Sequence, residues 1–108
     1  MRTEIFGKNI TLRRLQQSFI PEVFEAAFES RGGEFTRWMP WCHAHYEISE
    51  TRSFTIYSED CWESATEYNF AIFENSSGNF AGMVSLNQFN FQHKLVNLGY
   101  WIRVSKQN

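Results

Sequence analysis

The spacing of the apolar residues changes between the middle and the last part of this chain, from a helical period to a strand period. Between Ile20 and Phe28 the apolar side chains recur every three or four residues, which forms the single stripe of an amphipathic helix. From Tyr68 onward the period is two, so that Phe70 and Ile72 share one face of a strand. Helices followed by neighbouring strands predict an α+β fold, and 108 residues suit one domain.

The first part of the chain predicts a short strand and then a helix. The strand covers residues 10–15, where apolar and polar side chains alternate. The helix has Ser18 as its expected N-cap and Pro21 in its first turn, where the missing N–H costs nothing. It is expected to break or end at Gly32 and Gly33.

A second helix is expected over residues 49–64. Ser49 is a good N-cap, and the carboxylate of Glu50 suits the positive end of a helix. Residues 38–46, which precede it, fit neither period and are expected to form an ordered loop. The apolar stripe of this helix is expected to comprise Phe54, Tyr57, Cys61 and Trp62.

The last part of the chain predicts an antiparallel three-stranded meander. Residues 67–88 form a β-hairpin in this interpretation, with Gly78 in the turn at positive φ. The third strand covers residues 96–104 and is apolar although it is the final element. Its outer edge would present a row of N–H and C=O groups, so we expect further chain, a second copy or a partner to pair with Leu98–Val104.

Composition and charge exclude several classes of protein. The net charge of −2 and the pI near 5.9 give no basic footprint for nucleic acid. No apolar run approaches the ~20 residues that a membrane helix needs, and the first residues lack the apolar stretch of a signal peptide. Cys42 and Cys61 are therefore expected as free thiols in a cytoplasmic protein.

The segment Cys42-His43-Ala44-His45 is the one metal-like cluster in the sequence. Zinc needs three or four converging ligands, and only the distant His93 could add one, so we expect a surface loop and no metal. The carboxylates are expected on solvated faces, and neither cysteine has an identifiable base beside it. The spacing of these residues therefore identifies no catalytic group.

Two tryptophans flank a proline in the segment Trp38-Met39-Pro40-Trp41. Two indoles held by a proline form a rigid apolar wall. Such a wall serves equally as core packing and as the side of a pocket or an interface, and both interpretations stay open.

Seven blocks of residues, taken in order, resemble a known family. They are Leu12-Arg13-Arg14-Leu15, Trp38–His43, Glu50-Thr51, Tyr68–Phe73, Ser77–Gly82, Leu86-Asn87-Gln88 and Asn97–Arg103. Together they resemble the GNAT acyltransferase superfamily, in the RimJ/RimL-like branch that acetylates the N-termini of ribosomal proteins. The resemblance covers nearly the whole chain and implies a partial GNAT fold.

The resemblance implies an acetyl-CoA-dependent N-acetyltransferase that acts on an amine without a metal. The main chain of Ile102, Arg103 and Val104 would meet the pantetheine arm and the thioester of acetyl-CoA. The residues implied on the acceptor side are Trp38, Trp41, Asn87 and Tyr100. No residue is identifiable as the base that removes the proton of the amine.

Members of this family continue from the strand that matches Leu98–Val104 into a glycine-rich loop, which binds the pyrophosphate of the cofactor. Residues 1–108 contain neither that loop nor the later strands, so we expect one truncated, N-terminal GNAT-like domain with weak or no activity alone. The exposed strand edge also predicts a homodimer. Two functions are therefore open, an N-acetyltransferase and a non-enzymatic dimeric binding or assembly module.

Overall fold

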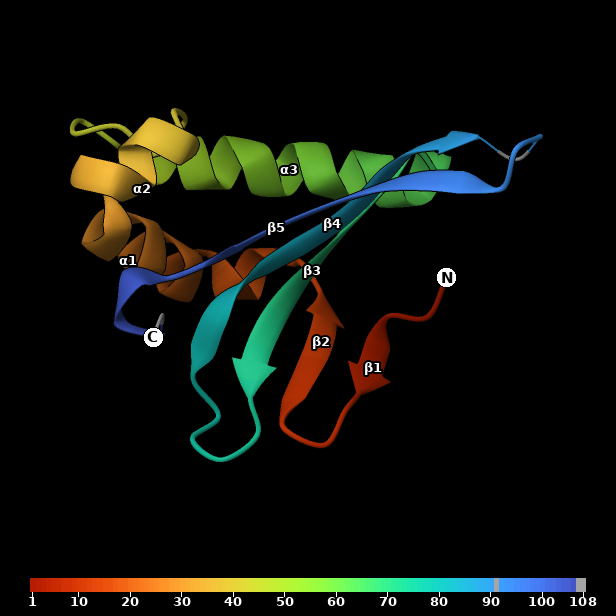
Figure 1. The fold of residues 1–108 in the computed structure, drawn as a ribbon, viewed down its shortest axis with the longest axis horizontal. Coiled ribbons are helices and arrows are strands. Elements are labelled where there is room, and N and C mark those ends of the chain that lie inside the picture. Colours follow the sequence, from red (N-terminus) through yellow and green to blue (C-terminus); the bar gives the residue numbers. More distant parts are fainter. Residues whose placement is uncertain (91, 107–108) are drawn as a thin grey trace.

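The computed structural model describes residues 1–90 and 92–106, and within them five strands form one antiparallel sheet (Figure 1). In their order across the sheet, the strands are β1 (Glu4–Phe6), β2 (Ile10–Arg14), β3 (Glu67–Glu74), β4 (Phe80–Asn90) and β5 (Leu95–Ile102). The helical elements are the 3₁₀ turns η1 (Gln17–Phe19) and η2 (Val104–Lys106) and the helices α1 (Ile20–Ser30), α2 (Gly33–Trp38) and α3 (Ile48–Ser64). The predicted α+β fold and its three-stranded meander are confirmed.

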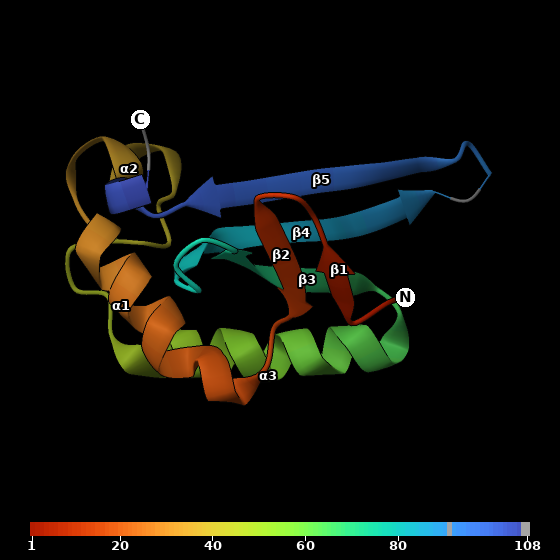
Figure 2. The same cartoon turned by 90° about the horizontal axis from the view of Figure 1, so that it is seen from below.

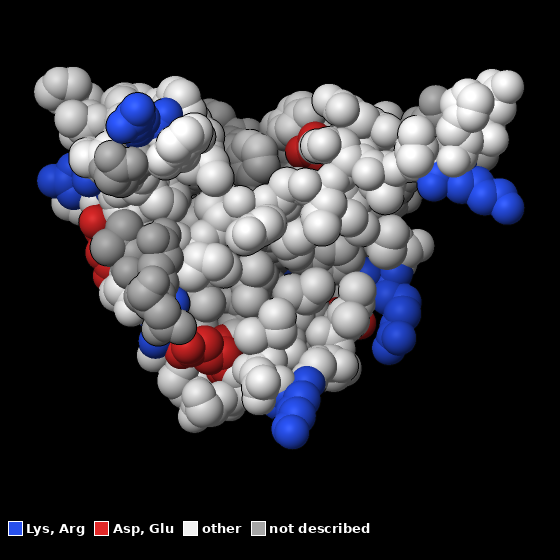
Figure 3. Space-filling view, viewed as in Figure 1, with Lys and Arg blue, Asp and Glu red and all other residues white. Residues whose placement is uncertain are grey.

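The helices α1 and α3 lie on the same side of the sheet (Figure 2). The amide of Asn69 in β3 donates a hydrogen bond to Ser58 of α3 at 3.0 Å, which ties that helix to the sheet. Over the described residues no helix covers the opposite face, and the centre of that face carries no charge (Figure 3). β5 forms one edge of the sheet, as the sequence predicts.

The main core lies between α1 and the sheet. Its buried members are Leu15, Val23, Ala26, Ala71, Phe80, Met83 and Trp101. These residues come from α1, from Leu15 directly after β2, and from all three strands of the meander. The core therefore fixes β5, at the edge of the sheet, against the helical layer.

The apolar stripe expected on α3 is wrong at two of its four residues. Cys61 and Trp62 are buried as predicted, but Phe54 and Tyr57 are 37% and 52% exposed. The buried side of α3 instead includes Thr51, Thr55 and Ser58. These side chains are small and satisfied by hydrogen bonds, such as that of Thr55 to the Thr51 carbonyl at 2.8 Å. Phe54 and Tyr57 are left to border a pocket.

The predicted N-caps differ from those in the structure. Glu47, not Ser49, caps α3, because its side chain accepts from the backbone of Glu50 while Glu50 accepts from the Glu47 N–H at 2.7 Å. This reciprocal pair is a capping box. Ser18 does not cap α1, which follows directly from η1, whereas Pro21 does lie in its first turn.

Two short elements have no counterpart in the sequence prediction. β1 is a three-residue strand that pairs Ile5 with Leu12 of β2. α2 begins at Gly33, which has a φ of +55°, so the glycine pair separates two helices. Between α2 and α3, residues 39–47 form an irregular connection, in agreement with the expected loop.

Gly78 has a φ of +75° in the turn between β3 and β4, as predicted. None of the described helices combines the length and the apolar character that a membrane span requires.

Candidate functional site

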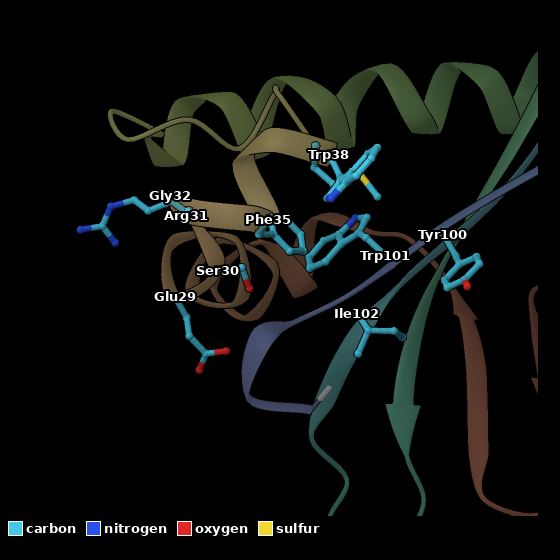
Figure 4. A pocket seen from close by; sticks show the side chains of 11 residues that line it. Glu29, Ser30, Arg31, Gly32, Phe35, Trp38, Tyr100, Trp101 and Ile102 are labelled. Atoms are coloured by element: carbon cyan, nitrogen blue, oxygen red, sulfur yellow. The ribbon is translucent and has the colours of Figure 1, made fainter. Parts of the chain in front are cut away.

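A first pocket lies at the end of β5, beside the junction of α1 and α2 (Figure 4). We call it the β5-end pocket; its volume is about 820 Å³. Figure 4 shows Trp101 directed from β5 toward Phe35 and Trp38, whereas Tyr100 projects from the other side of the strand. Arg31 also lines it. Its guanidinium points away from the aromatic side chains in Figure 4 and donates to the Phe28 carbonyl, so the pocket is mainly an aromatic one.

A second pocket of about 650 Å³ lies between α3 and the strands β4 and β5. We call it the α3 pocket. Aromatic side chains line much of it, namely Trp41, Tyr46, Phe54, Tyr57, Tyr100 and Trp101. The two pockets share Met39, Tyr100 and Trp101, so they are adjacent and meet at the edge strand.

Trp101 is the centre of the aromatic contacts at this junction. Its ring centroid lies 5.9 Å from that of Phe35, 5.5 Å from that of Trp41 and 5.9 Å from that of Phe80. The rings meet at edge-to-face or tilted angles, which suit their quadrupoles. The side chain of Trp101 thus packs against α2, against the loop after it and against β4.

The structure places all four residues expected on the acceptor side at the two pockets, but not all at one of them. Trp41 and Asn87 line the α3 pocket, and Trp38, which is 71% exposed, lines the β5-end pocket. Tyr100 borders both. Both tryptophans of the Trp-Met-Pro-Trp segment therefore line a pocket, and neither is among the buried core residues.

The residues expected at the cofactor lie at and beyond the end of β5. Ile102 lines the β5-end pocket and is the last residue of the strand. The N–H of Arg103 donates to the Ala81 carbonyl at 2.9 Å, so that amide serves the pairing with β4. Val104 begins the turn η2, and β5 is therefore two residues shorter at this end than the predicted strand.

The side chain of Arg103 ties the end of β5 to α1. Its guanidinium donates from Nε and Nη2 to the two carboxylate oxygens of Glu29 at 3.1 and 2.9 Å. A bidentate pair of this kind is both strong and directional. Glu25 lies farther away, at 3.6 Å from the same guanidinium.

The pair predicts a specific loss of stability in acid. The hydrogen bonds from Arg103 lower the pKa of Glu29 from an ordinary value of 4.5 to about 2. A carboxyl whose pKa is depressed by folding stabilises the fold above its unfolded pKa, and this contribution disappears as the pH falls toward the folded pKa. The free energy of unfolding should therefore fall between about pH 4.5 and pH 2. Urea titrations of wild type and Glu29→Gln over this range measure the effect. The free energy of unfolding of the variant should fall less than that of the wild type.

Glu25→Gln is the matched control, because this carboxylate is 76% exposed and 3.6 Å from Arg103. We expect its free energy of unfolding to change with pH as that of the wild type does. Equal profiles for wild type and Glu29→Gln would contradict the role given to the Arg103–Glu29 pair.

Glu67 is a residue of the α3 pocket lining that the sequence pattern does not single out. The side-chain amides of Asn69 and Asn87 donate to its two carboxylate oxygens at 2.8 and 3.1 Å. Asn97 donates in turn to Asn87 at 3.0 Å. Glu67 is half-buried, and was expected on a solvated face because its position at the start of a strand gives no sign of the pocket.

Tyr57 lies beside Glu67 in the same pocket. A hydrogen bond with Cys61, together with the charges of Glu67 and Cys61, raises the pKa of Tyr57 to about 12. The phenol therefore keeps its proton at neutral pH. Glu50, the other carboxylate of the lining, is hydrogen-bonded to His43 at 3.0 Å and to its own capping box. Those hydrogen bonds lower the pKa of Glu50.

The Cys-His segment is more buried than expected. Cys42 is fully buried, and its thiol donates to the Ala27 carbonyl at 3.0 Å. Burial raises the pKa of this thiol, which suits a structural cysteine. Among the side chains that the structure describes, no three of His, Cys, Asp or Glu are grouped so that they could hold a metal ion.

Sequence comparison places the chain in a family. The model of the acetyltransferase (GNAT) domain matches residues 9–108. The chain belongs to the GNAT acetyltransferase family. The blocks that carried the resemblance, including the Trp38–His43 segment and the strand through Arg103, lie inside the matched range.

Solved structures share the RimL-like GNAT fold. A protein described as a ribosomal-protein-serine acetyltransferase from Vibrio cholerae has a TM-score of 0.81 at 24% identity, over 97% of this chain and 58% of its own. RimL, the ribosomal L7/L12 α-N-protein acetyltransferase in complex with coenzyme A, has a TM-score of 0.76 at 20% identity, over 94% and 55%. The Microcin C7 self-immunity acetyltransferase MccE, in complex with acetyl-CoA and AMP, has a TM-score of 0.73 at 20% identity, over 94% and 54%.

This GNAT chain therefore spans a little over half the length of the solved structures that it resembles. That share is consistent with the expected N-terminal half of a GNAT domain. No curated protein shows a significant sequence match to it.

Proposed function

We propose that this chain is the N-terminal half of an acetyl-CoA-dependent N-acetyltransferase domain that acts on an amine. The observation that carries the proposal is the position of β5, whose outer edge borders two adjacent pockets. An acetyl donor and an amine acceptor must meet at one point, and the two pockets meet at Tyr100 and Trp101. Family membership and the coenzyme A and acetyl-CoA complexes of RimL and MccE support this interpretation.

The edge of β5 fits the pantetheine arm of acetyl-CoA. Arg103 uses its N–H for Ala81, and groups directed toward and away from a partner strand alternate along an antiparallel ladder. The N–H and C=O groups of Leu98 and Tyr100 therefore face the outer edge. The arm contains amides that can pair with such an edge as an added strand would.

The β5-end pocket offers few positive charges to the phosphates of the cofactor. Among the described residues that line the β5-end pocket, Arg31 is the single Lys or Arg. We therefore propose that the chain by itself binds acetyl-CoA weakly and is weak or inactive as an enzyme. Ile102, Arg103 and Val104 would hold the arm near this pocket, Arg103 by keeping the end of β5 fixed to α1.

Acetyl-CoA, when bound, supplies the acetyl group as a thioester. The residues of the chain then have two tasks. N–H groups on the β5 edge can donate to an oxygen that gains negative charge. Trp41, Asn87 and Tyr100 can hold the acceptor in the α3 pocket, while Trp38 closes the neighbouring one. The proposed role of these residues is to position the thioester and the amine; none of them is identified as a base.

Thermal denaturation with and without millimolar acetyl-CoA tests the proposal. A ligand that binds only the folded state raises the midpoint with the logarithm of its concentration over Kd, so a weakly bound cofactor should give a shift smaller than the several degrees expected at ~100 times Kd. We expect a saturable shift with acetyl-CoA and a smaller one with desulfo-CoA. An unchanged midpoint at millimolar acetyl-CoA would contradict the proposed binding of acetyl-CoA by this chain.

A non-enzymatic dimeric module is the second candidate, and the exposed β5 strand favours it. Leu95, Leu98 and Tyr100 are 63%, 60% and 66% exposed there. Two copies that paired these edges would bury this surface and satisfy both rows of backbone groups. Because acetyl-CoA would need the same edge, it should dissociate such a dimer. Light scattering at high micromolar concentration, with and without acetyl-CoA, measures this; a monomer under both conditions would contradict the dimer.

A further inference from the structure

We propose that the α3 pocket selects an acceptor that enters as a primary ammonium on an apolar or aromatic body, and that Glu67 is the residue that binds the ammonium. This inference rests on the proposed function and extends it to the class of acceptor. It makes Glu67 a specificity-determining residue. Four features of the pocket support it.

The pocket has an uncompensated negative charge. Among the described residues that line it are two carboxylates, Glu50 and Glu67, and no Lys or Arg. Glu50 is already committed to His43 and to the cap of α3. Glu67 is therefore the carboxylate whose charge is left for a ligand.

The partners of Glu67 orient its carboxylate without neutralising it. Each oxygen accepts a hydrogen bond from an asparagine amide, at 2.8 Å from Asn69 and 3.1 Å from Asn87, and the carboxylate is also hydrogen-bonded to the Tyr57 hydroxyl. A carboxylate has about four acceptor positions, so capacity remains for an ammonium. Asn69 is itself fixed by its hydrogen bond to Ser58 at 3.0 Å, which makes the arrangement rigid.

The phenol of Tyr57 beside Glu67 is also neutral, since its pKa is raised to about 12. None of the neighbours described for this carboxylate thus carries a positive charge. A half-buried anion in this setting attracts a cation more strongly than one in open solvent does, because the surrounding medium screens it less.

The rest of the lining suits the body of such an acceptor. Aromatic faces of Trp41, Tyr46 and Trp101 attract both apolar groups and cations. Gly99 leaves space there, because a Cβ at this position would meet no atom within 4 Å. Anionic acceptors, in contrast, would be repelled by both carboxylates.

Binding of three matched small probes to the 108-residue chain tests the inference without acetyl-CoA. Phenethylamine carries the ammonium, 2-phenylethanol is its neutral analogue and 3-phenylpropionate is an anionic one. A charge-assisted hydrogen bond should make the amine bind about tenfold more tightly than the alcohol, with the anion weakest. Titrations followed by ¹H–¹⁵N chemical shifts give the three Kd values.

Glu67→Gln removes the charge and keeps the size of the side chain, so the preference for the amine should fall to about twofold or less. Glu63→Gln is the control, because Glu63 is an exposed residue of α3 outside the lining, and it should keep the full preference. Equal affinity for amine and alcohol in the wild type, or a preference that survives in Glu67→Gln, would overturn the inference.

A second measurement does not depend on the fold of the variant. In the wild type, the ¹³C chemical shift of the Glu67 carboxylate should change when phenethylamine is added and stay constant when 2-phenylethanol is added. A constant shift with phenethylamine would overturn the inference. The acetyl-CoA thermal shift separates the two proposals. If the chain prefers the amine but shows no acetyl-CoA shift, the proposed acetyltransferase function alone is refuted. If it shows the shift but does not prefer the amine, the proposed role of Glu67 alone is refuted.

Discussion

Replacing Trp101 by Ala should lower the free energy of unfolding by about 3–5 kcal/mol, which is the usual cost of truncating a buried tryptophan to alanine. The side chain is 9% exposed and belongs to the main core. Its loss would leave a cavity between α2, the following loop and β4, since Phe35, Trp41 and Phe80 all contact its ring. Equilibrium unfolding in urea measures the change.

Trp38→Ala is the matched control for this experiment. It removes the same side chain from the same pocket, but Trp38 is 71% exposed, so we expect a change within about 0.5 kcal/mol. If the two variants lost equal stability, the central packing role of Trp101 would be wrong.

Gly82→Ala should destabilise the protein by about 1–3 kcal/mol or more, as overpacking does. A Cβ on Gly82 would lie 2.1 Å from the Trp101 carbonyl oxygen and 3.0 Å from the Cα of Ile102. Both contacts are to backbone, so β5 itself would have to move away from β4. Thermal and urea unfolding give the loss of stability, and a weaker acetyl-CoA shift would show the displacement of the edge strand.

Gly99→Ala provides the comparison within the same pair of strands. Gly99 lies opposite Ser85 of β4, and a Cβ there would meet no atom within 4 Å. We expect its stability to stay close to that of the wild type. A loss as large as that of Gly82→Ala would show that glycine flexibility in the sheet, and not the close approach of β5, governs both positions.

The effects of these variants converge on one strand. β5 carries Tyr100 and Trp101, which line both pockets. The strand is fixed to the core by the side chain of Trp101 and, at its end, to α1 by the Arg103–Glu29 pair. Since the sheet ends there, these side-chain contacts replace the second row of backbone hydrogen bonds that a central strand would have.

The class of fold and the location of its main elements can be predicted from local sequence patterns. The change of period at Tyr68, the turn at Gly78 and Pro21 in the first turn of α1 each act over a few residues. Local patterns of this kind are visible without any tertiary contact. The family resemblance, carried by the Trp38–His43 segment and the Gly99–Arg103 strand, is confirmed by the match over residues 9–108.

Which residues come into contact depends on how the elements pack in three dimensions. Arg103 and Glu29 are 74 positions apart, and Asn87 and Glu67 are 20 apart, so no spacing along the chain could pair them. This packing also reversed local expectation on α3, where Thr51 faces the interior and Phe54 borders a pocket. The reason is that the burial of a side chain depends on how close the neighbouring layer comes. On α3 the side chains buried at close approach include the small, hydrogen-bonded Thr51, Thr55 and Ser58, which the apolar period of the helix does not pick out.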